Sequence, residues 1–317
     1  MNALTNRIRE IARNLLEEGR VDVVIGFERG TTPLRSTPCF ARTPGDTDRL
    51  VWNGFCGNNL ANYVVKRKER TAVVAKGCDS RALVELIKEN QIPRERLHII
   101  GVPCNGMLDR TRIETEFHHR IVLEVEEQDG SVMVKGKDVE KVLRREDFLY
   151  PSCRACVQRN PILCDDLAGE AVEEAGEDSY RDIEEFEGLP DEERWAYFSR
   201  EMDRCIRCYA CRNACPLCYC EECFVDCSMP QWIGKSVDPS DTALFHLMRA
   251  FHLAGRCVEC GACERACPLG IDIRKLNRKL AKDVLDLYGY RAGTNPGAAA
   301  PLSTYRPDDP EAFVLEP

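Results

Sequence analysis

The chain has 317 residues and lacks any apolar run of about 18 residues, the length that a helix needs to cross a bilayer. Residues 1–18 are charged and lack the apolar core and small-residue cleavage site of a secretory signal. The sequence also lacks a GxGxxG fingerprint, a P-loop and a Ser/His/Asp arrangement. These absences argue against a membrane-spanning or exported protein and against the common nucleotide-binding and hydrolytic chemistries. We therefore expect a cytoplasmic protein.

A net positive charge is also missing. The net charge of −9 argues against nucleic-acid binding, because that function favours a basic face. Hydrophobic residues make up 44% and charged residues 31%, which is ordinary for a globular protein, and the length suggests about two domains. Cysteine, in contrast, is abundant, with 19 residues. Since the cytosol keeps thiols reduced, so many cysteines indicate metal ligation rather than a disulfide scaffold.

Two cysteine motifs share one form, C-x2-C-x2-C-x3-C-P, at residues 205–216 and 257–268. This motif holds 4Fe–4S clusters in bacterial two-cluster ferredoxins, where three close cysteines bind one cluster and the fourth binds the other. The predicted ligands of one cluster are Cys205, Cys208, Cys211 and Cys267, and those of the other are Cys257, Cys260, Cys263 and Cys215. Zinc bound by CxxC pairs is the competing interpretation, which three consecutive steps followed by Cys-Pro disfavour.

Four more cysteines could hold a third 4Fe–4S cluster, with a structural zinc or unrelated buried thiols as alternatives. They are Cys104, Cys153, Cys156 and Cys164. Cys56 and Cys78 compete with Cys104 for its place, because they lie in similar loops at strand ends. Cys78 follows Lys76 at the start of a predicted helix, a setting that favours thiolate. It could be a cluster ligand, a flavin neighbour or a small buried residue.

A further group could hold an additional metal centre, shield the clusters or supply alternative ligands. It comprises Cys218, Cys220, Cys223 and Cys227. We expect Cys39 to be uninvolved and His118, His119 and His246 to be surface or packing residues.

Periodicity predicts an open, parallel-type α/β domain over residues 1–164. It contains a helix at 4–16, strands at 21–27, 71–75 and 97–102, a helix at 81–89 capped by Asp79 or Ser80, and a hairpin of 121–125 with 131–134. An acidic, solvated linker with helical patches is predicted over 165–203, and an extended tail over 291–317.

Residues 204–290 are predicted to form an α-helical domain that holds the two clusters of the repeated motif. Ser240 is the expected N-cap of one helix, whose apolar face comprises Leu244, Leu247, Met248, Phe251 and Ala254. A second helix is expected over 271–288, with Leu276, Leu280, Val284 and Leu287 inward. Two cluster motifs with helices between them resemble the α-helical ferredoxin module of succinate-dehydrogenase iron–sulfur subunits and heterodisulfide-reductase small subunits.

Residues 74–83, 100–104 and 151–156 resemble the beta-subunit family of deazaflavin-reducing hydrogenases and formate dehydrogenases, with its KPCD-type loop and later CxxC. The likeness covers roughly residues 20–170. It implies FAD, reduction of a deazaflavin coenzyme and one or more 4Fe–4S clusters. The chain departs from the family at residues 54–60, where asparagines replace the small hydroxyl residues of the flavin loop. This departure counts against FAD and against deazaflavin reduction.

The C-terminal part resembles fused ferredoxin subunits of hydrogenase, formate-dehydrogenase or heterodisulfide-reductase-like complexes of anaerobes. We therefore predict a non-catalytic iron–sulfur subunit that relays electrons between catalytic and flavin subunits of such a complex. The alternatives are a flavin-containing oxidoreductase subunit acting on a deazaflavin or nicotinamide coenzyme, and a zinc-stabilised scaffold.

Overall fold

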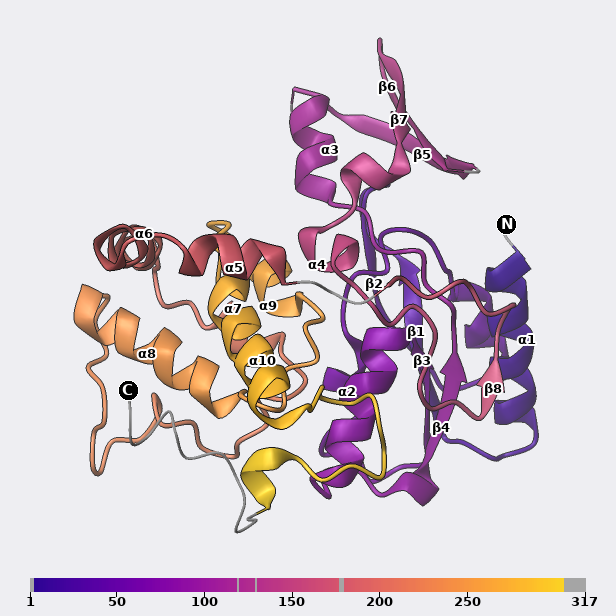
Figure 1. The fold of residues 1–317 in the computed structure, drawn as a ribbon. Coiled ribbons are helices and arrows are strands. Elements are labelled where there is room, and N and C mark those ends of the chain that lie inside the picture. Colours follow the sequence, from indigo (N-terminus) through magenta and orange to yellow (C-terminus); the bar gives the residue numbers. More distant parts are fainter. Residues whose placement is uncertain (1–2, 119, 129, 177–179, 305–317) are drawn as a thin grey trace. The chain divides into compact units, whose positions relative to one another are not determined.

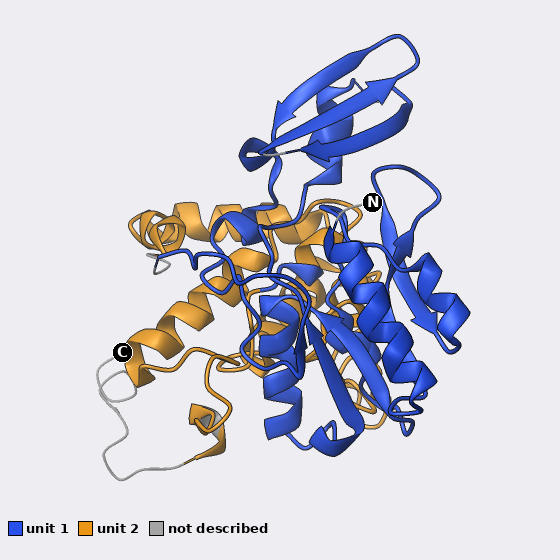
Figure 2. Cartoon of the chain, turned by 90° about the vertical axis from the view of Figure 1, so that its right-hand side faces the viewer, with its two compact units in different colours: residues 1–178, 260–262 blue, residues 179–259, 263–317 orange. Residues whose placement is uncertain are grey.

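The structure is a computed structural model that describes residues 3–118, 120–128, 130–176 and 180–304. The chain divides into two compact units (Figure 2). The first comprises residues 1–178 with 260–262, and the second comprises residues 179–259 with 263–317. Each unit is described separately below. From residue 305 on, the predicted tail lies outside the described residues.

The first unit contains a five-stranded sheet in the order β2-β1-β3-β4-β8 (Figure 1). Its strands are β1 (Val23–Arg29), β2 (Ser36–Ala41), β3 (Thr71–Ala75), β4 (Leu97–Gly101) and β8 (Asp166–Leu167). The pairs β1–β3, β3–β4 and β4–β8 are parallel, and β2 is antiparallel to β1. The centre of β3 and β4 is almost wholly buried, as in parallel sheets covered on both faces. This confirms the predicted parallel-type α/β arrangement.

Helices α1 (Ala3–Glu17) and α2 (Gly77–Lys88) lie on opposite sides of this sheet (Figure 1). The predicted cap of α2 is wrong, because the helix begins four residues earlier than expected, with Lys76 as N-cap. Asp79 is the third helical residue, and its carboxylate accepts a hydrogen bond from the Lys76 backbone N–H at 3.0 Å. This is the backward half of a capping box. The shift places Cys78 in the first helical turn.

A three-stranded antiparallel sheet packs against a short helix in the same unit (Figure 1). The strands are β5 (Val122–Gln128), β6 (Ser131–Gly136) and β7 (Glu140–Arg144), and the helix is α3 (Arg110–Glu116). Ile113, Phe117, Val132, Val134 and Leu143 form its buried core. The predicted hairpin is confirmed, although residue 129 of its turn lies outside the described residues. Strand β7 has no counterpart among the predicted elements. Short helix α4 (Pro151–Arg154) follows, and 3-10 turns lie at Pro44–Arg49, Leu60–Tyr63, Arg94–Arg96 and Arg145–Phe148.

The described part of the second unit is helical (Figure 1). Its helices are α5 (Arg181–Glu187), α6 (Asp191–Asp203), α7 (Ala210–Asn213), α8 (Pro239–His252), α9 (Ala262–Ala266), whose first residue belongs to the first unit, and α10 (Arg274–Tyr288), with a 3-10 turn at Pro301–Ser303. A helical C-terminal region is therefore confirmed. No helix among the described residues has the length and apolar character needed to cross a membrane.

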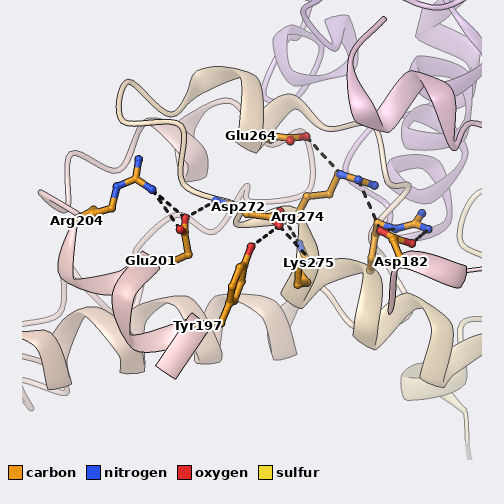
Figure 3. Close-up of polar contacts among 9 residues, drawn as sticks. Asp182, Tyr197, Glu201, Arg204, Glu264, Asp272, Arg274 and Lys275 are labelled. Carbon is orange, nitrogen blue, oxygen red and sulfur yellow. Dashed lines mark hydrogen bonds and ion pairs between the residues drawn. The ribbon is translucent and has the colours of Figure 1, made fainter. Parts of the chain in front are cut away.

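The segment 165–203 contains helices where helical patches were predicted, and parts of it also pack against other elements. It contributes β8 to the first unit and α5 and α6 to the second, where Ile183 and Met202 are buried. Polar contacts hold these helices in place (Figure 3): Tyr197 donates to Asp272 at 2.8 Å, and Glu201 accepts from the Asp272 backbone N–H at 3.1 Å. Acidic residues of this segment also pair with basic residues of α10.

One such pair joins α5 to α10. Arg278 donates to both carboxylate oxygens of Asp182, at 2.7 and 3.1 Å, and is itself 2% exposed. The pKa of Asp182 lies below its ordinary value: burial raises it, but the hydrogen bond and charge of Arg278 lower it by more. Bidentate arginine–carboxylate pairs of this kind fix geometry as well as charge.

Helix α8 presents to the interior a different face from the one predicted. Its N-cap is Asp238, whose carboxylate accepts from the Ser240 backbone N–H at 2.9 Å, so Ser240 is not the cap. Its buried side chains are Thr242, Phe245, His246, Arg249 and Ala250. The predicted inward residues Leu244, Met248 and Phe251 are instead 41%, 37% and 56% exposed. In α10 the prediction holds better: Val284 is buried, Leu276 and Leu280 are half-buried, and Leu287 is exposed.

Candidate metal centres

Four thiols of the first unit form an electrostatically connected group: Cys78, Cys104, Cys153 and Cys156. Burial, with a smaller contribution from Cys153, raises the pKa of Cys104 to about 12. Burial also raises the pKa of Cys156, and burial together with Asp79 raises that of Cys78. Buried thiols that raise one another's pKa are unfavourable as bare thiolates. A bound cationic centre would remove that penalty.

The backbone around this group directs N–H donors at two of the sulfurs. Gly106 N–H donates to Cys104 Sγ and Met107 N–H donates to Cys153 Sγ, each at 3.3 Å. Gly106 has φ +89°, and a Cβ there would lie 3.3 Å from Cys153 Cβ and 3.0 Å from Leu149, so a side chain would be strained. Hydrogen bonds to sulfur are one means by which proteins tune bound iron–sulfur clusters. The two N–H donors are thus of the kind that would tune a cluster held by Cys104 and Cys153.

Cys78 interacts electrostatically with Cys156, one of the predicted ligands of the third cluster. Cys164 is exposed, and the charges that raise its pKa, after burial, are Asp165 and Asp166. The sequence held a signal for Cys78. It follows β3 and Cys104 follows β4, and these neighbouring strands are parallel, so the two cysteines reach the same edge of the sheet.

A buried cation lies beside these thiols. Lys76 is 2% exposed, pairs with Asp79 at 2.8 Å and donates to the Asn58 carbonyl at 2.9 Å. Burial lowers the pKa of Lys76, but the charges of Asp79, Cys78 and Cys104 raise it by more, so that the net pKa is raised. Lys76 therefore remains charged at neutral pH.

Asn59, one of the asparagines of residues 54–60, contacts the start of helix α2. Asn59 caps the 3-10 turn Leu60–Tyr63, and its Nδ2 donates to the Cys78 carbonyl at 3.4 Å. Leu60 N–H donates to Asp79 at 3.2 Å, so this loop holds the first turn of α2. Cys56 is buried nearby and accepts from the Asn53 N–H at 3.4 Å, and burial raises its pKa to about 12. Cys39 is buried in β2, where burial and Glu28 raise its pKa to about 11.

In the second unit, members of the first predicted ligand set interact with one another in pairs. The thiol of Cys205 interacts electrostatically with Cys267 and Cys208, and that of Cys211 with Cys205. Arg207 N–H donates to Cys205 Sγ and Ile271 N–H donates to Cys267 Sγ, each at 3.4 Å. Arg207 and Tyr209, which flank Cys208 in the sequence, have φ of 48° and 59°. Left-handed backbone at two such residues is strain of the kind that gathers at functional sites.

Three members of the second predicted set also lie together. Burial raises the pKa of Cys257, and Glu259, Cys263 and Cys215 raise it further. Asn277 Nδ2 lies 3.7 Å from Cys263 Sγ in a buried setting. The remaining member, Cys260, is counted with the first unit.

The buried face of α8 adds two groups that sequence reasoning missed. His246 Nε2 lies 3.3 Å from Cys205 Sγ, and Arg249 Nη2 donates to the Cys211 carbonyl at 3.2 Å. Burial, followed by the charges of Arg249 and Arg207, lowers the pKa of His246 to about 4, so the ring is neutral at pH 7. The predicted packing role of His246 is thus incomplete. This polar face turned towards the cysteines explains why the apolar face of α8 lies outward.

The group Cys218, Cys220, Cys223 and Cys227 does not converge on one point. Cys218 hydrogen bonds with Cys215, which lowers the pKa of Cys218, whereas Cys227 interacts with Glu222 and Cys223. Cys220 is exposed. Across the described residues, no group of three or more His, Cys, Asp and Glu side chains has the geometry to hold a metal ion. All 19 cysteines lie in the described part of the chain, and no disulfide joins any of them.

Comparison with known proteins places these cysteines in a family context. Residues 68–183 match the family model that describes the C terminus of the coenzyme F420 hydrogenase/dehydrogenase beta subunit. The chain is 25% identical to the F420-dependent formate dehydrogenase subunit beta of Methanocaldococcus jannaschii, over 91% of each chain. It is 24% identical to the F420-dependent formate dehydrogenase 1 subunit beta of Methanococcus maripaludis, over 93% of this chain and 92% of that one. The predicted resemblance to this family is confirmed.

Among solved structures, a chain of the F420-reducing [NiFe] hydrogenase complex from Methanosarcina barkeri is similar, at 16% identity and a TM-score of 0.39. The match covers 48% of this chain and 58% of that one.

Proposed function

We propose that this chain is an iron–sulfur electron-transfer subunit of a multi-subunit oxidoreductase complex. The observation that carries the proposal is the set of interacting thiols in each unit, with backbone N–H groups directed at Cys104, Cys153, Cys205 and Cys267. Bound 4Fe–4S clusters would supply one-electron carriers there. The chain's own contribution is to hold the ligands, shield them from water and supply donors and charges that set the potentials.

We assign Cys205, Cys208, Cys211 and Cys267 to one cluster, and Cys257, Cys260, Cys263 and Cys215 to the other, in a helical two-cluster ferredoxin domain. The crossed assignment follows the spacing of the repeated motif. Electrostatic interactions of Cys205 with Cys267, and of Cys257 with Cys215, support it. In the first unit we assign a third cluster to Cys104, Cys153, Cys156 and Cys78.

The names of the relatives support the kind of complex. Both are beta subunits of F420-dependent formate dehydrogenases and match over more than 90% of their length. We therefore infer that this chain relays electrons to or from a catalytic partner of the formate dehydrogenase or hydrogenase type. Similarity to subunits over more than 90% of their length favours a role within a complex.

Anaerobic quantitation of iron, acid-labile sulfide, zinc and flavin on the purified chain tests the function. Three clusters correspond to about twelve irons and twelve sulfides per chain, since each cubane holds four of each. Abundant zinc without sulfide would instead support a scaffold. One flavin per chain would revive the oxidoreductase alternative.

Replacing Cys78 and Cys164 by serine in two separate variants tests the proposed third cluster. We expect Cys78→Ser to lose about four irons per chain, because it removes a thiolate from the buried group. Cys164→Ser, a matched change at an exposed thiol, should keep the full iron content. Iron analysis together with low-temperature EPR measures both. The reverse result would restore Cys164 as the ligand.

A further inference from the structure

Helix α8 carries a buried arginine, Arg249, which is not one of the predicted cluster ligands. Arg249 is 4% exposed, and its Nη2 donates to the Cys211 carbonyl at 3.2 Å. Its Nε is buried and has no hydrogen-bond partner among the described residues. Burying a guanidinium with a free N–H is costly unless negative charge lies close by. The thiols around Arg249, and what they hold, are the source of such charge.

The electrostatic neighbours of Arg249 are four thiols, Cys263, Cys215, Cys218 and Cys211. Cys211 belongs to one proposed ligand set, and Cys215 and Cys263 belong to the other. The guanidinium therefore interacts with both sets at once. Arginine stays protonated in proteins, so this charge is permanent.

His246 lies one turn away on the same face of α8 and contacts one set alone. Its Nε2 is 3.3 Å from Cys205 Sγ. A ligating cysteine is a thiolate without a proton, so the ring N–H must be the donor in this contact. Its Nδ1 is buried and has no hydrogen-bond partner in the described part of the chain.

Resting on the proposed function, we propose that α8 sets the reduction potentials of the two centres in the second unit. Arg249 supplies a positive charge shared by both centres, and His246 supplies a hydrogen bond to one of them. Reduction adds an electron, so a nearby cation favours the reduced form of each centre and raises its potential. A hydrogen bond to a ligand sulfur acts in the same direction but only on its own centre. Arg249 and His246 are thus positioning residues that act through the ligands.

Redox titration of the full-length, reconstituted protein, followed by EPR, tests this proposal. Each potential is assigned to its centre by its loss in Cys208→Ser or Cys257→Ser. In Arg249→Gln, which can still donate to the Cys211 carbonyl, we expect reduction of both centres by a given donor to become about tenfold less favourable. For a one-electron couple this is about 59 mV per centre. In His246→Leu only the centre of Cys205 should shift downward.

Two further variants separate charge from structure. Arg249→Lys keeps the charge and should keep both potentials close to wild type. Arg181→Gln removes an arginine that is 81% exposed in the same unit and should change neither potential. Unchanged potentials in a fully loaded Arg249→Gln would overturn the inference and leave the proposed function standing. Absence of iron and sulfide from the wild-type protein would overturn the function itself.

The iron and sulfide content of the variants provides a second criterion if Arg249→Gln binds its clusters incompletely. A charge role predicts that Arg249→Lys loads fully even when Arg249→Gln does not. Failure of both variants to load would overturn the inference, because lysine retains the charge and loses only the shape of the guanidinium.

Discussion

Replacing Cys208 with serine is expected to remove about four irons and four sulfides per chain and to stop electron flow through the complex. Cys208 is the second of the four cysteines in the first motif and interacts with Cys205, so its loss removes one ligand of the proposed cluster. Electron transfer through a chain of centres fails when one centre is missing. The first unit should remain folded, because its core does not include this residue.

The measurement combines iron and sulfide analysis, EPR and turnover with the natural partner subunits. Cys220→Ser is the matched control, since Cys220 is also exposed and stands outside the repeated motif. It should leave the iron content and electron flow unchanged. Undiminished electron flow in Cys208→Ser would remove this centre from the relay.

Asp79→Asn is expected to destabilise the first unit by about 3–5 kcal/mol, the usual effect of removing one partner of a buried ion pair. Asp79 is 0% exposed and accepts from the backbone N–H groups of Lys76 and Leu60 as well as pairing with Lys76 Nζ. Asparagine keeps the shape but leaves the lysine charge buried and uncompensated. Because the same contacts position Cys78, loss of the third cluster should accompany the loss of stability.

Urea unfolding of the full-length protein, followed by the fluorescence of Trp52, measures this effect. Trp52 is suited to it because its ring lies 5.9 Å from Lys76 Nζ, and Trp195 and Trp232 are replaced by phenylalanine in all variants. Adding Lys76→Met to Asp79→Asn should recover part of the loss, since no unpaired charge then remains. Asp22→Asn, at an exposed pair with Arg70, should shift the midpoint far less. Equal shifts at the two sites would contradict the buried-pair argument.

The pH dependence of this stability has a definite sign. In the wild type the folded-state pKa of Lys76 is raised, so its contribution is fully present below the ordinary lysine value of about 10.4 and is lost as pH rises through the folded value. In Asp79→Asn burial acts on Lys76 without its carboxylate partner and lowers the folded-state pKa. The variant should therefore gain stability, relative to wild type, as the pH rises towards 10.

Local sequence was enough to predict the secondary structure wherever periodicity and burial agree. The strand predicted at residues 71–75 and the helix predicted at residues 4–16 match β3 and α1 closely. The continuous apolar run of β3 is typical of a buried strand, and the regularly spaced apolar residues of α1 are typical of an amphipathic helix. The spacing of the repeated cysteine motif also predicts two ligand sets, and this assignment stays a prediction.

The buried face of helix α8 could not be predicted in this way. A rule that turns apolar faces inward chose Leu244, Met248 and Phe251, whereas the fold buries His246 and Arg249. The burial of Arg249 depends on thiols that other segments of the unit contribute. Their negative charge compensates the positive charge of Arg249, which would otherwise disfavour burial of this side chain.

Cys78 and Cys104 illustrate the same division. The sequence by itself determined that the protein is cysteine-rich, free of a nucleotide fingerprint and equipped with two ferredoxin-type motifs. Only the tertiary structure decided that Cys78, 26 residues before Cys104, shares its sheet edge, while Cys164 interacts with Asp165 and Asp166. The physical reason is that strand pairing brings together segments that are distant in sequence. No local sequence pattern indicates which strands become neighbours.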